Sequence, residues 1–190
     1  MILIPVMESM DGILSELSGL IDILEKNGTE LKNDSISFVR KLEAAAEKYR
    51  LPIASQLSVI RGKLVCGAPK PENTVLNRRE YRALEKSFIL SQLEAVNDCV
   101  NGCLEDSRRV FAECEKLACQ VTVRLKAKGE LEGYEAASLN GGGIMALASR
   151  DGELAPIVVH IAGLAGALNT KIIFDKTMSL SGLYDPEENQ

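Results

Sequence analysis

One long amphipathic stretch, from about Asn77 to Lys128, constrains the fold of this chain more than any other feature of its sequence. On a helix of about 100° per residue, its apolar side chains fall in one sector and charged side chains lie opposite. The phase does not change across Gly102, so the pattern favours one uninterrupted helix. The apolar sector contains Leu84, Phe88, Val96, Cys99, Val100, Cys103, Val110, Phe111, Cys114, Leu117, Val121 and Leu125.

The length of this helix raises the question of what covers it. At roughly 1.5 Å per residue it would be about 78 Å long, whereas a compact domain of this chain length is about 35 Å across. The excess predicts that something else covers its far end, most simply a second copy in a homodimer. The alternative is a helical hairpin, because Asn101-Gly102 and the polar run from Glu105 to Arg109 are suited to a turn.

Three shorter helices are expected before the long one. The first spans Glu8 to about Lys26, where apolar residues recur every three or four positions. The second begins after the N-cap cluster Asn33-Asp34-Ser35 and ends before Pro52, because a residue preceding proline avoids the helical conformation. The third covers Ile53 to Val65, and a loop rich in proline and glycine follows over residues 66–73.

The last third of the chain is punctuated by glycine. A short helix is expected from Ile144 to Ser149, and another should begin at Pro156, which is favoured in the first helical turn. Residues 157–161 and 171–174 are rich in β-branched side chains and are the alternative candidates for short strands, although the first of them favours helix. The polar residues 185–190 predict a disordered tail.

These elements predict an all-α fold. The expected architecture is an antiparallel bundle of five or six helices with one very long central helix, or helical hairpin, and a Gly-rich, less regular C-terminal third. The predicted organisation is a helical bundle over residues 1–128 that contains the long helix at 77–128, a region over 129–184 that packs on the same core, and an acidic tail over 185–190.

Composition restricts the class of protein. Hydrophobic residues make up 46% and charged residues 26% of the chain, which excludes a disordered or collagen-like protein. The net charge of −5 argues against a general nucleic-acid coat. Five cysteines are an odd number, and the opening residues lack the pattern of a secretory signal, so reduced thiols and a cytoplasmic location are expected. No uncharged apolar run reaches about 18 residues, so no membrane span is predicted.

The cysteines and the single histidine are the reactive candidates. Cys99 and Cys103 lie one helical turn apart, as two metal ligands would, and Cys114 falls near the same azimuth. All three lie in the apolar sector, where a thiol packs as a small hydrophobe. His160 lies in an apolar run, and Cys119 points to the polar side and is the most reactive thiol expected. We therefore assign no catalytic residue, no metal site and no cofactor.

The stretch Asn140-Gly141-Gly142-Gly143 is a weak candidate for cofactor binding. It precedes a possible helix start, where free backbone N–H groups bind anions. The chain continues with Ile144-Met145-Ala146 instead of the Gly-Lys-Ser/Thr of a nucleotide-binding loop, which favours a flexible connector. A ligand site here would draw its charge from Arg108 or Arg109 on the long helix.

Positive charge is concentrated in residues 61–86, which hold seven Lys or Arg against three Glu. Such a region suits an acidic protein, a phosphate or RNA. Tyr81 is the only aromatic residue within it, and a solvated patch without a ligand is the simplest interpretation. With two aromatic residues of the long helix, this region supplies the interface candidates: Arg61, Lys63, Arg78, Arg79, Arg82, Phe88 and Phe111.

The function predicted from these features is protein interaction. The chain is expected to act as a scaffold, an adaptor or a homo-oligomeric subunit through its long helix and its apolar N-terminal segment, residues 1–7. The expected partner is another protein, most simply a second copy. The alternatives are a small-molecule-binding or enzymatic bundle with its site near Asn140–Gly143, and, less favoured, a nucleic-acid-associated protein that uses the basic region.

Overall fold

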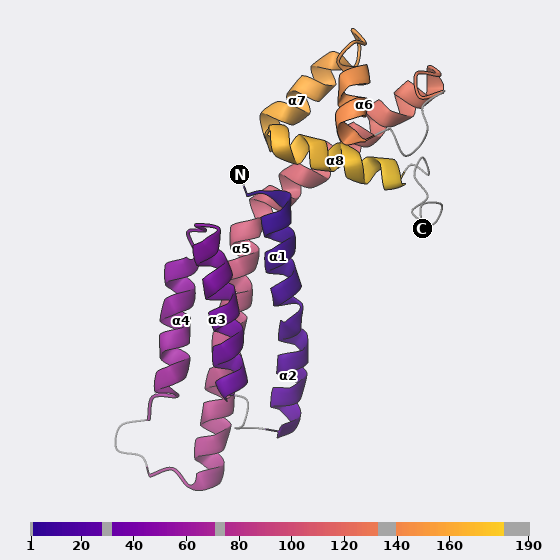
Figure 1. Ribbon diagram of the computed structural model, residues 1–190. Coiled ribbons are helices and arrows are strands. Elements are labelled where there is room, and N and C mark those ends of the chain that lie inside the picture. Colours follow the sequence, from indigo (N-terminus) through magenta and orange to yellow (C-terminus); the bar gives the residue numbers. More distant parts are fainter. Residues whose placement is uncertain (1, 28–31, 71–74, 133–139, 181–190) are drawn as a thin grey trace. The chain divides into compact units, whose positions relative to one another are not determined.

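The computed structural model describes residues 2–27, 32–70, 75–132 and 140–180 (Figure 1). Within these ranges every regular element is an α-helix and no residue lies in a strand, which confirms the all-α prediction. The helices are α1 (Ile4–Leu14), α2 (Glu16–Asn27), α3 (Lys32–Lys48), α4 (Ala54–Cys66), α5 (Arg78–Ala127), α6 (Gly141–Ala148), α7 (Ala155–Ala165) and α8 (Ala167–Leu180).

The helices outnumber the five or six expected, and the C-terminal third is more regular than expected. Ser15 interrupts the first predicted helix and separates α1 from α2. Gly166 ends α7 with φ near +80°, a conformation that glycine adopts without strain, and α8 begins at the next residue. Because α7 and α8 include residues 157–161 and 171–174, neither candidate strand forms.

The central stretch forms one continuous helix, α5, so the hairpin alternative is wrong. At its start, the Asn77 side chain accepts a hydrogen bond from the Glu80 N–H at 2.9 Å, and the Glu80 carboxylate accepts one from the Asn77 N–H at 2.8 Å. This reciprocal pair is a capping box. At its end, Gly129 has φ near +74° and the Glu130 N–H donates to the Leu125 carbonyl at 3.1 Å, as in a Schellman motif.

The chain divides into two compact units. The N-terminal unit is Pro5–Glu105, and the C-terminal unit combines Met1–Ile4 with Asp106–Gln190. The expectation that a partner covers the far end of α5 assumed a single compact domain, whereas each unit buries its own part of the helix; a partner on α5 stays a prediction. The apolar α5 residues that are at most 3% exposed are Ile89, Leu93, Val96, Val100, Leu104, Phe111, Cys114, Ala118, Val121 and Leu125.

The core of the N-terminal unit lies among α3, α4 and α5. α3 packs against α4, and α2 packs against α3. Aromatic and aliphatic side chains from these helices are fully buried, although Ile89 and Leu93 were not in the apolar sector expected for the long helix. The largest of them are Phe38, Leu42, Leu57, Leu64, Ile89 and Leu93.

The apolar start of the chain is built into the C-terminal unit. The Ile4 N–H donates to the Asn169 Oδ1 atom at 3.0 Å, and the Asn169 side-chain amide donates to the Ile2 carbonyl at 3.4 Å. Ile4 is only 1% exposed. The prediction that residues 1–7 form a free contact surface is therefore corrected for this side chain.

Three short helices complete the C-terminal unit. α8 packs against both α6 and α7. Among the described residues no single helix has both the length and the hydropathy to span a bilayer. Ala155–Ala165 and Ala167–Met178 reach that length and hydropathy only together, and the chain bends by 119° between them.

Candidate functional site

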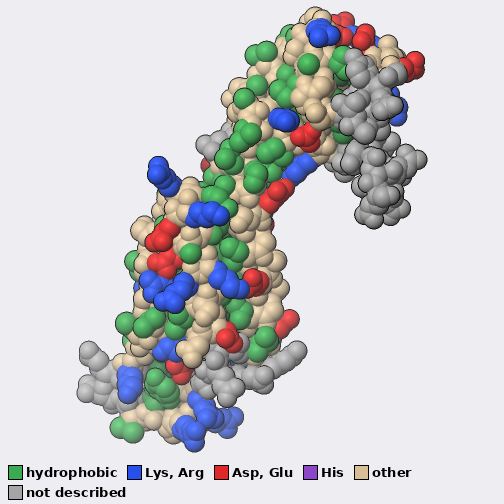
Figure 2. Space-filling model, viewed as in Figure 1, with side chains coloured by type: hydrophobic (Ala, Val, Ile, Leu, Met, Phe, Trp, Pro, Cys, Tyr) green, Lys and Arg blue, Asp and Glu red, His purple; other side chains and the backbone are tan. Residues whose placement is uncertain are grey.

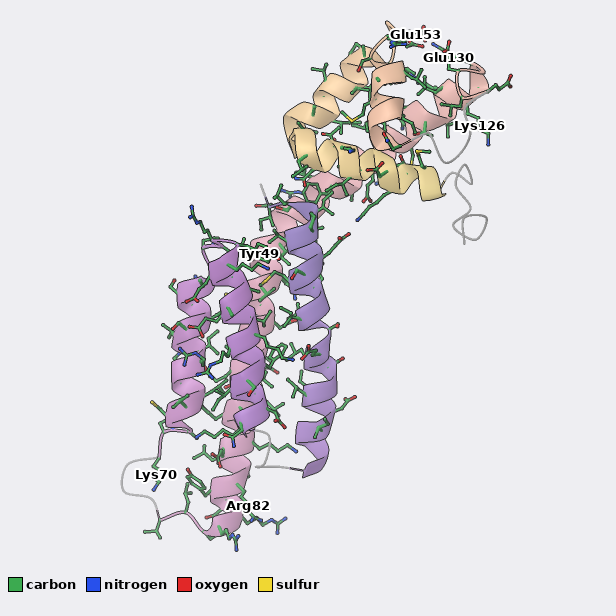
Figure 3. The ribbon with its side chains drawn as sticks, in the orientation of Figure 1. Tyr49, Lys70, Arg82, Lys126, Glu130 and Glu153 are labelled. Atoms are coloured by element: carbon green, nitrogen blue, oxygen red, sulfur yellow. The ribbon has the colours of Figure 1, made fainter. Side chains whose placement is uncertain are left out.

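The structure gathers part of the predicted basic region on one exposed surface at the start of α5 (Figures 2 and 3). Lys and Arg side chains lie at this end of the N-terminal unit in Figure 2, as they do elsewhere along it, and Figure 3 labels Lys70 and Arg82 there. An apolar side chain, Val75, is 99% exposed in the middle of this region. We call this surface the basic patch and define it by five exposed residues: Lys70, Val75, Arg78, Arg79 and Arg82.

The basic patch combines cationic and apolar groups. A hollow of about 440 Å³ is lined by Lys70, Val75, Leu76, Arg78 and Tyr81. The Lys70 Nζ atom lies 5.8 Å from the centroid of the Tyr81 ring, within the range of a cation–π contact. A surface of this kind offers both charge and apolar area to a partner.

Other interface candidates lie elsewhere. Arg61 forms an ion pair with Glu43 on the neighbouring helix, with a 2.5 Å contact between Nε and Oε2. The hydrogen bond from Arg61 lowers the pKa of the Glu43 carboxyl from its ordinary value. Lys63 and Phe88 line a separate apolar hollow of about 480 Å³. Phe111 is only 3% exposed in the C-terminal unit, so it offers little surface to a partner, and its role as a contact residue stays a prediction.

The stretch Asn140–Gly143 has a structural role at the start of α6. The Asn140 side chain accepts a hydrogen bond from the Gly143 N–H at 3.0 Å, and Asp175 on α8 accepts one from the Gly141 N–H. A Cβ atom on Gly141 would lie 2.5 Å from the Lys171 carbonyl oxygen, so glycine is what allows α6 to approach α8 this closely. An anion would have to compete with these acceptors, and cofactor binding here stays a prediction.

The reactive candidates differ in exposure. Cys66 and His160 are exposed, whereas Cys114 is buried. Burial raises the pKa of the Cys114 thiol, which makes its reactive thiolate form scarcer. Over the described ranges, no group of three or more His, Cys, Asp or Glu side chains could hold a metal ion. The remaining thiols, Cys99, Cys103 and Cys119, are half-buried.

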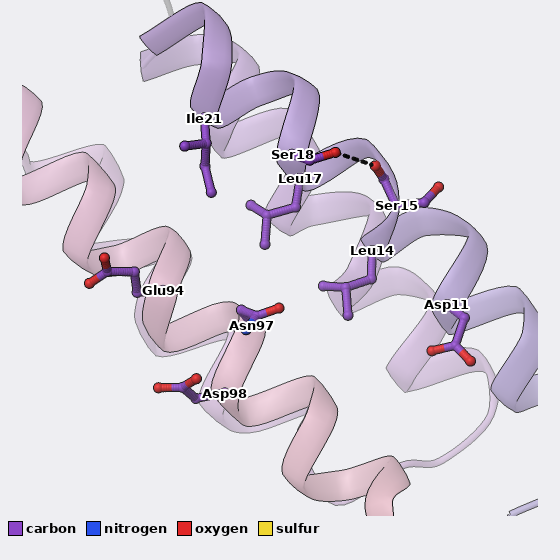
Figure 4. A pocket seen from close by; sticks show the side chains of 9 residues that line it. All are labelled: Asp11, Leu14, Ser15, Leu17, Ser18, Ile21, Glu94, Asn97 and Asp98. Carbon is purple, nitrogen blue, oxygen red and sulfur yellow. Dashed lines mark hydrogen bonds between the residues drawn. The ribbon is translucent and has the colours of Figure 1, made fainter. Parts of the chain in front are cut away.

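A groove that the sequence analysis missed lies in the N-terminal unit, between α1–α2 and α5 (Figure 4). Its volume is about 650 Å³. α1 and α2 meet at Ser15, where leucine and serine side chains alternate along the wall. Ser15 and Ser18 are exposed, and their hydroxyls donate to the Gly12 and Ser15 carbonyls of their own segment. The groove is lined by Asp11, Leu14, Ser15, Leu17, Ser18, Ile21, Glu94, Asn97 and Asp98.

The floor of this groove is apolar. Leu14, Leu17 and Ile21 recur at helical spacing and point towards α5 in Figure 4. Leu17 is 6% exposed, and the other two are half-buried. The half-buried side chains keep apolar surface that a bound side chain would remove from water.

The rim of the groove is acidic. Asp11 lies on one wall, and Glu94 and Asp98 lie on the other. Glu94 and Asp98 are one turn apart on α5, an arrangement of like charges that weakly destabilises a helix. Such an arrangement favours a ligand that brings positive charge. We call this site the acidic groove.

The charge pattern of the sequence contains a signal for this site. Residues 1–25 hold five Asp or Glu and no Lys or Arg, and residues 87–107 hold four Asp or Glu and no Lys or Arg. These two stretches supply all the residues that line the groove. A search for segments without basic residues would have marked both walls, although not their proximity in space.

Comparison with known proteins assigns no family: no protein-family model matches the chain, and no curated protein or solved structure is significantly similar to it. The function is therefore inferred from the surfaces described above.

Proposed function

We propose that this protein is a protein-interaction subunit, acting as a scaffold, an adaptor or a component of an assembly, whose acidic groove binds an amphipathic helix with a basic face. The observation that carries the proposal is an apolar floor bordered by carboxylates in a space of about 650 Å³ between helices of one unit. An amphipathic helix commonly docks in such a groove through its apolar side.

The dimensions of the groove suit a short helix. Its lining on α1 and α2 runs from Asp11 to Ile21, which at about 1.5 Å per residue corresponds to roughly 15 Å, or nearly three helical turns. A bound helix of that length would present apolar side chains three, four and seven positions apart to the aliphatic floor.

The charges of the groove favour Lys and Arg beside those apolar anchors. The carboxylates of Asp11, Glu94 and Asp98 create a negative potential along the rim. Complementary charges across an interface speed association and discriminate between partners. Binding through exposed charges of this kind should weaken as salt increases.

The test uses a synthetic helical peptide in which leucine and lysine alternate at helical spacing, labelled for fluorescence anisotropy. A matched peptide carries glutamate at each lysine position. We expect the lysine peptide to bind and the glutamate peptide not to bind, and we expect the affinity for the lysine peptide to fall as salt is added.

Two variants locate the binding site. Ile21→Asn places a polar group in the floor of the groove, and E94Q/D98N removes two charges from its rim. Each variant should weaken binding of the lysine peptide. For E94Q/D98N the expected loss of affinity is roughly tenfold, since each charge contributes about 0.7 kcal/mol. Glu113→Gln removes an exposed charge from the same helix outside the groove and serves as the control. Equal affinity in wild-type protein and both groove variants would contradict the proposal.

A further inference from the structure

The two charged surfaces of the N-terminal unit complement each other, and we propose that the basic patch of one copy docks in the acidic groove of a second copy. This inference rests on the proposed function, since it names the occupant of the same groove. The partner is thus another molecule of this chain, which contributes the exposed start of its α5.

The charges on the two surfaces have matching spacing. Arg78 and Arg82 are four residues apart on α5, and so are Glu94 and Asp98. Each pair therefore spans about 6 Å along a helix axis. Two guanidinium groups with this repeat can face two carboxylates with the same repeat, and Arg binds carboxylates well because its planar group donates several hydrogen bonds.

The apolar parts of the surfaces also complement each other. The basic patch exposes Val75 almost completely, and Leu76 and Tyr81 line the hollow beside it. The acidic groove offers the half-buried Leu14 and Ile21. Contact between them would remove apolar surface from water on both copies, which is the main favourable term in protein association.

One molecule does not bring its own two surfaces together. The arginine pair and the acidic pair belong to the same continuous helix, and their midpoints are 16 residues apart in the sequence. On a regular helix this places them about 24 Å apart along the axis and about 160° apart around it. The occupant of the groove must therefore come from a second molecule.

The same geometry determines the kind of assembly. In each contact one copy contributes its basic patch and the other its acidic groove, so the contact is heterologous. An open assembly therefore keeps a free groove at one end and a free patch at the other. The assembly consequently grows with protein concentration into chains or closes into a ring. Its size should fall when salt screens the charges.

The test is the mass of the full chain, measured by light scattering after size-exclusion chromatography over a range of protein concentrations. At roughly 50 mM salt, where charges are screened only over more than about 10 Å, we expect masses above the 20.6 kDa monomer that rise with concentration. In roughly 500 mM salt the mass should fall towards the monomer.

Charge exchange identifies the surfaces. The groove variant E94K/D98K and the patch variant R78E/R82E should each lose at least about tenfold in self-association affinity relative to wild type. The variant that carries all four substitutions restores opposite charges across the contact and should regain self-association. Circular dichroism checks that each variant keeps its helix content, and Glu113→Gln should associate like wild type.

The outcomes separate this inference from the proposed function. Wild-type protein that stays monomeric at low salt overturns self-docking, yet the proposed function survives if the lysine peptide still binds in the groove. Association that persists in E94K/D98K, or that the fourfold variant does not recover, also overturns the inference. Recovery in the fourfold variant supports it, because a variant that merely unfolds is not rescued by more substitutions.

Discussion

The contact between α6 and α8 gives a sharp prediction for Gly141→Ala. A Cβ atom at this position would lie 2.5 Å from the Lys171 carbonyl oxygen and 2.7 Å from the Asp175 backbone nitrogen. Both neighbours are backbone atoms of α8, so they cannot yield by changing a side-chain rotamer. An ordinary contact begins near 3.4 Å, and the two helices would have to separate by nearly 1 Å.

The expected cost follows from two opposing terms. Overpacking of this kind costs about 1–3 kcal/mol, and separation would also strain the hydrogen bond between the Gly141 N–H and Asp175. Against this, alanine is favoured over glycine in a helix by up to about 1 kcal/mol. We expect a net destabilisation of about 2 kcal/mol, which corresponds to a melting temperature about 4–8 °C lower if the whole chain unfolds together and about 8–16 °C lower if the C-terminal unit unfolds alone.

Gly143→Ala is the matched control, because it lies in the same helical turn. Its Cβ atom would meet only the Asn140 Oδ1 atom, at 4.0 Å, so we expect stability equal to or slightly above that of wild type. Thermal melts followed by circular dichroism give the difference, and hydrogen exchange in α6 and α8 shows where the structure opens. A Gly141→Ala variant as stable as Gly143→Ala would refute the reasoning.

Two further predictions concern the ion pair and the thiols. Because the hydrogen bond from Arg61 lowers the folded-state pKa of Glu43, the pair stabilises the protein above the ordinary pKa of glutamate, and this contribution is lost as the pH falls through the lowered value. Glu43→Gln should therefore unfold at a lower urea concentration than wild type at pH 7, with the gap closing in acid; a gap independent of pH would contradict this. Maleimide labelling of native protein should modify the exposed Cys66 first and the buried Cys114 last, and equal labelling rates would show that α5 is not covered around Cys114.

The helices themselves could be predicted because their signals are local. Pro52 predicts the end of α3, which is observed at Lys48, and the constant phase through Gly102 predicts one continuous α5. The expected caps Asn33–Ser35 lie inside the first turn of α3 instead, because the helix begins at Lys32. The β-branched segment 171–174 is ambiguous only in isolation. Over the whole of α8, buried residues recur every three or four positions, which is the helical period.

The division into two units could not be predicted from periodicity. A hydrophobic stripe shows which side of a helix is buried, but it does not show which part of the chain buries it. The buried stripe of α5 keeps one phase from Ile89 to Leu125. The boundary between the two units nevertheless falls within it, between Glu105 and Asp106. The helix is therefore not to be compared with the diameter of one compact domain, because each half of it is buried within its own unit.

The role of Gly141 and the position of the acidic groove could not be predicted either, because both depend on contacts between segments that are far apart in the sequence. Gly141 looked like part of a flexible loop, yet its missing side chain matters because the backbone of α8 lies against it, which no local pattern records. The walls of the groove are more than 70 residues apart in sequence, from Ile21 to Glu94. Their acidic bias is nevertheless visible in each stretch alone. In this fold residues from both stretches line one apolar groove, and this juxtaposition is the observation on which the proposed binding of a basic helix rests.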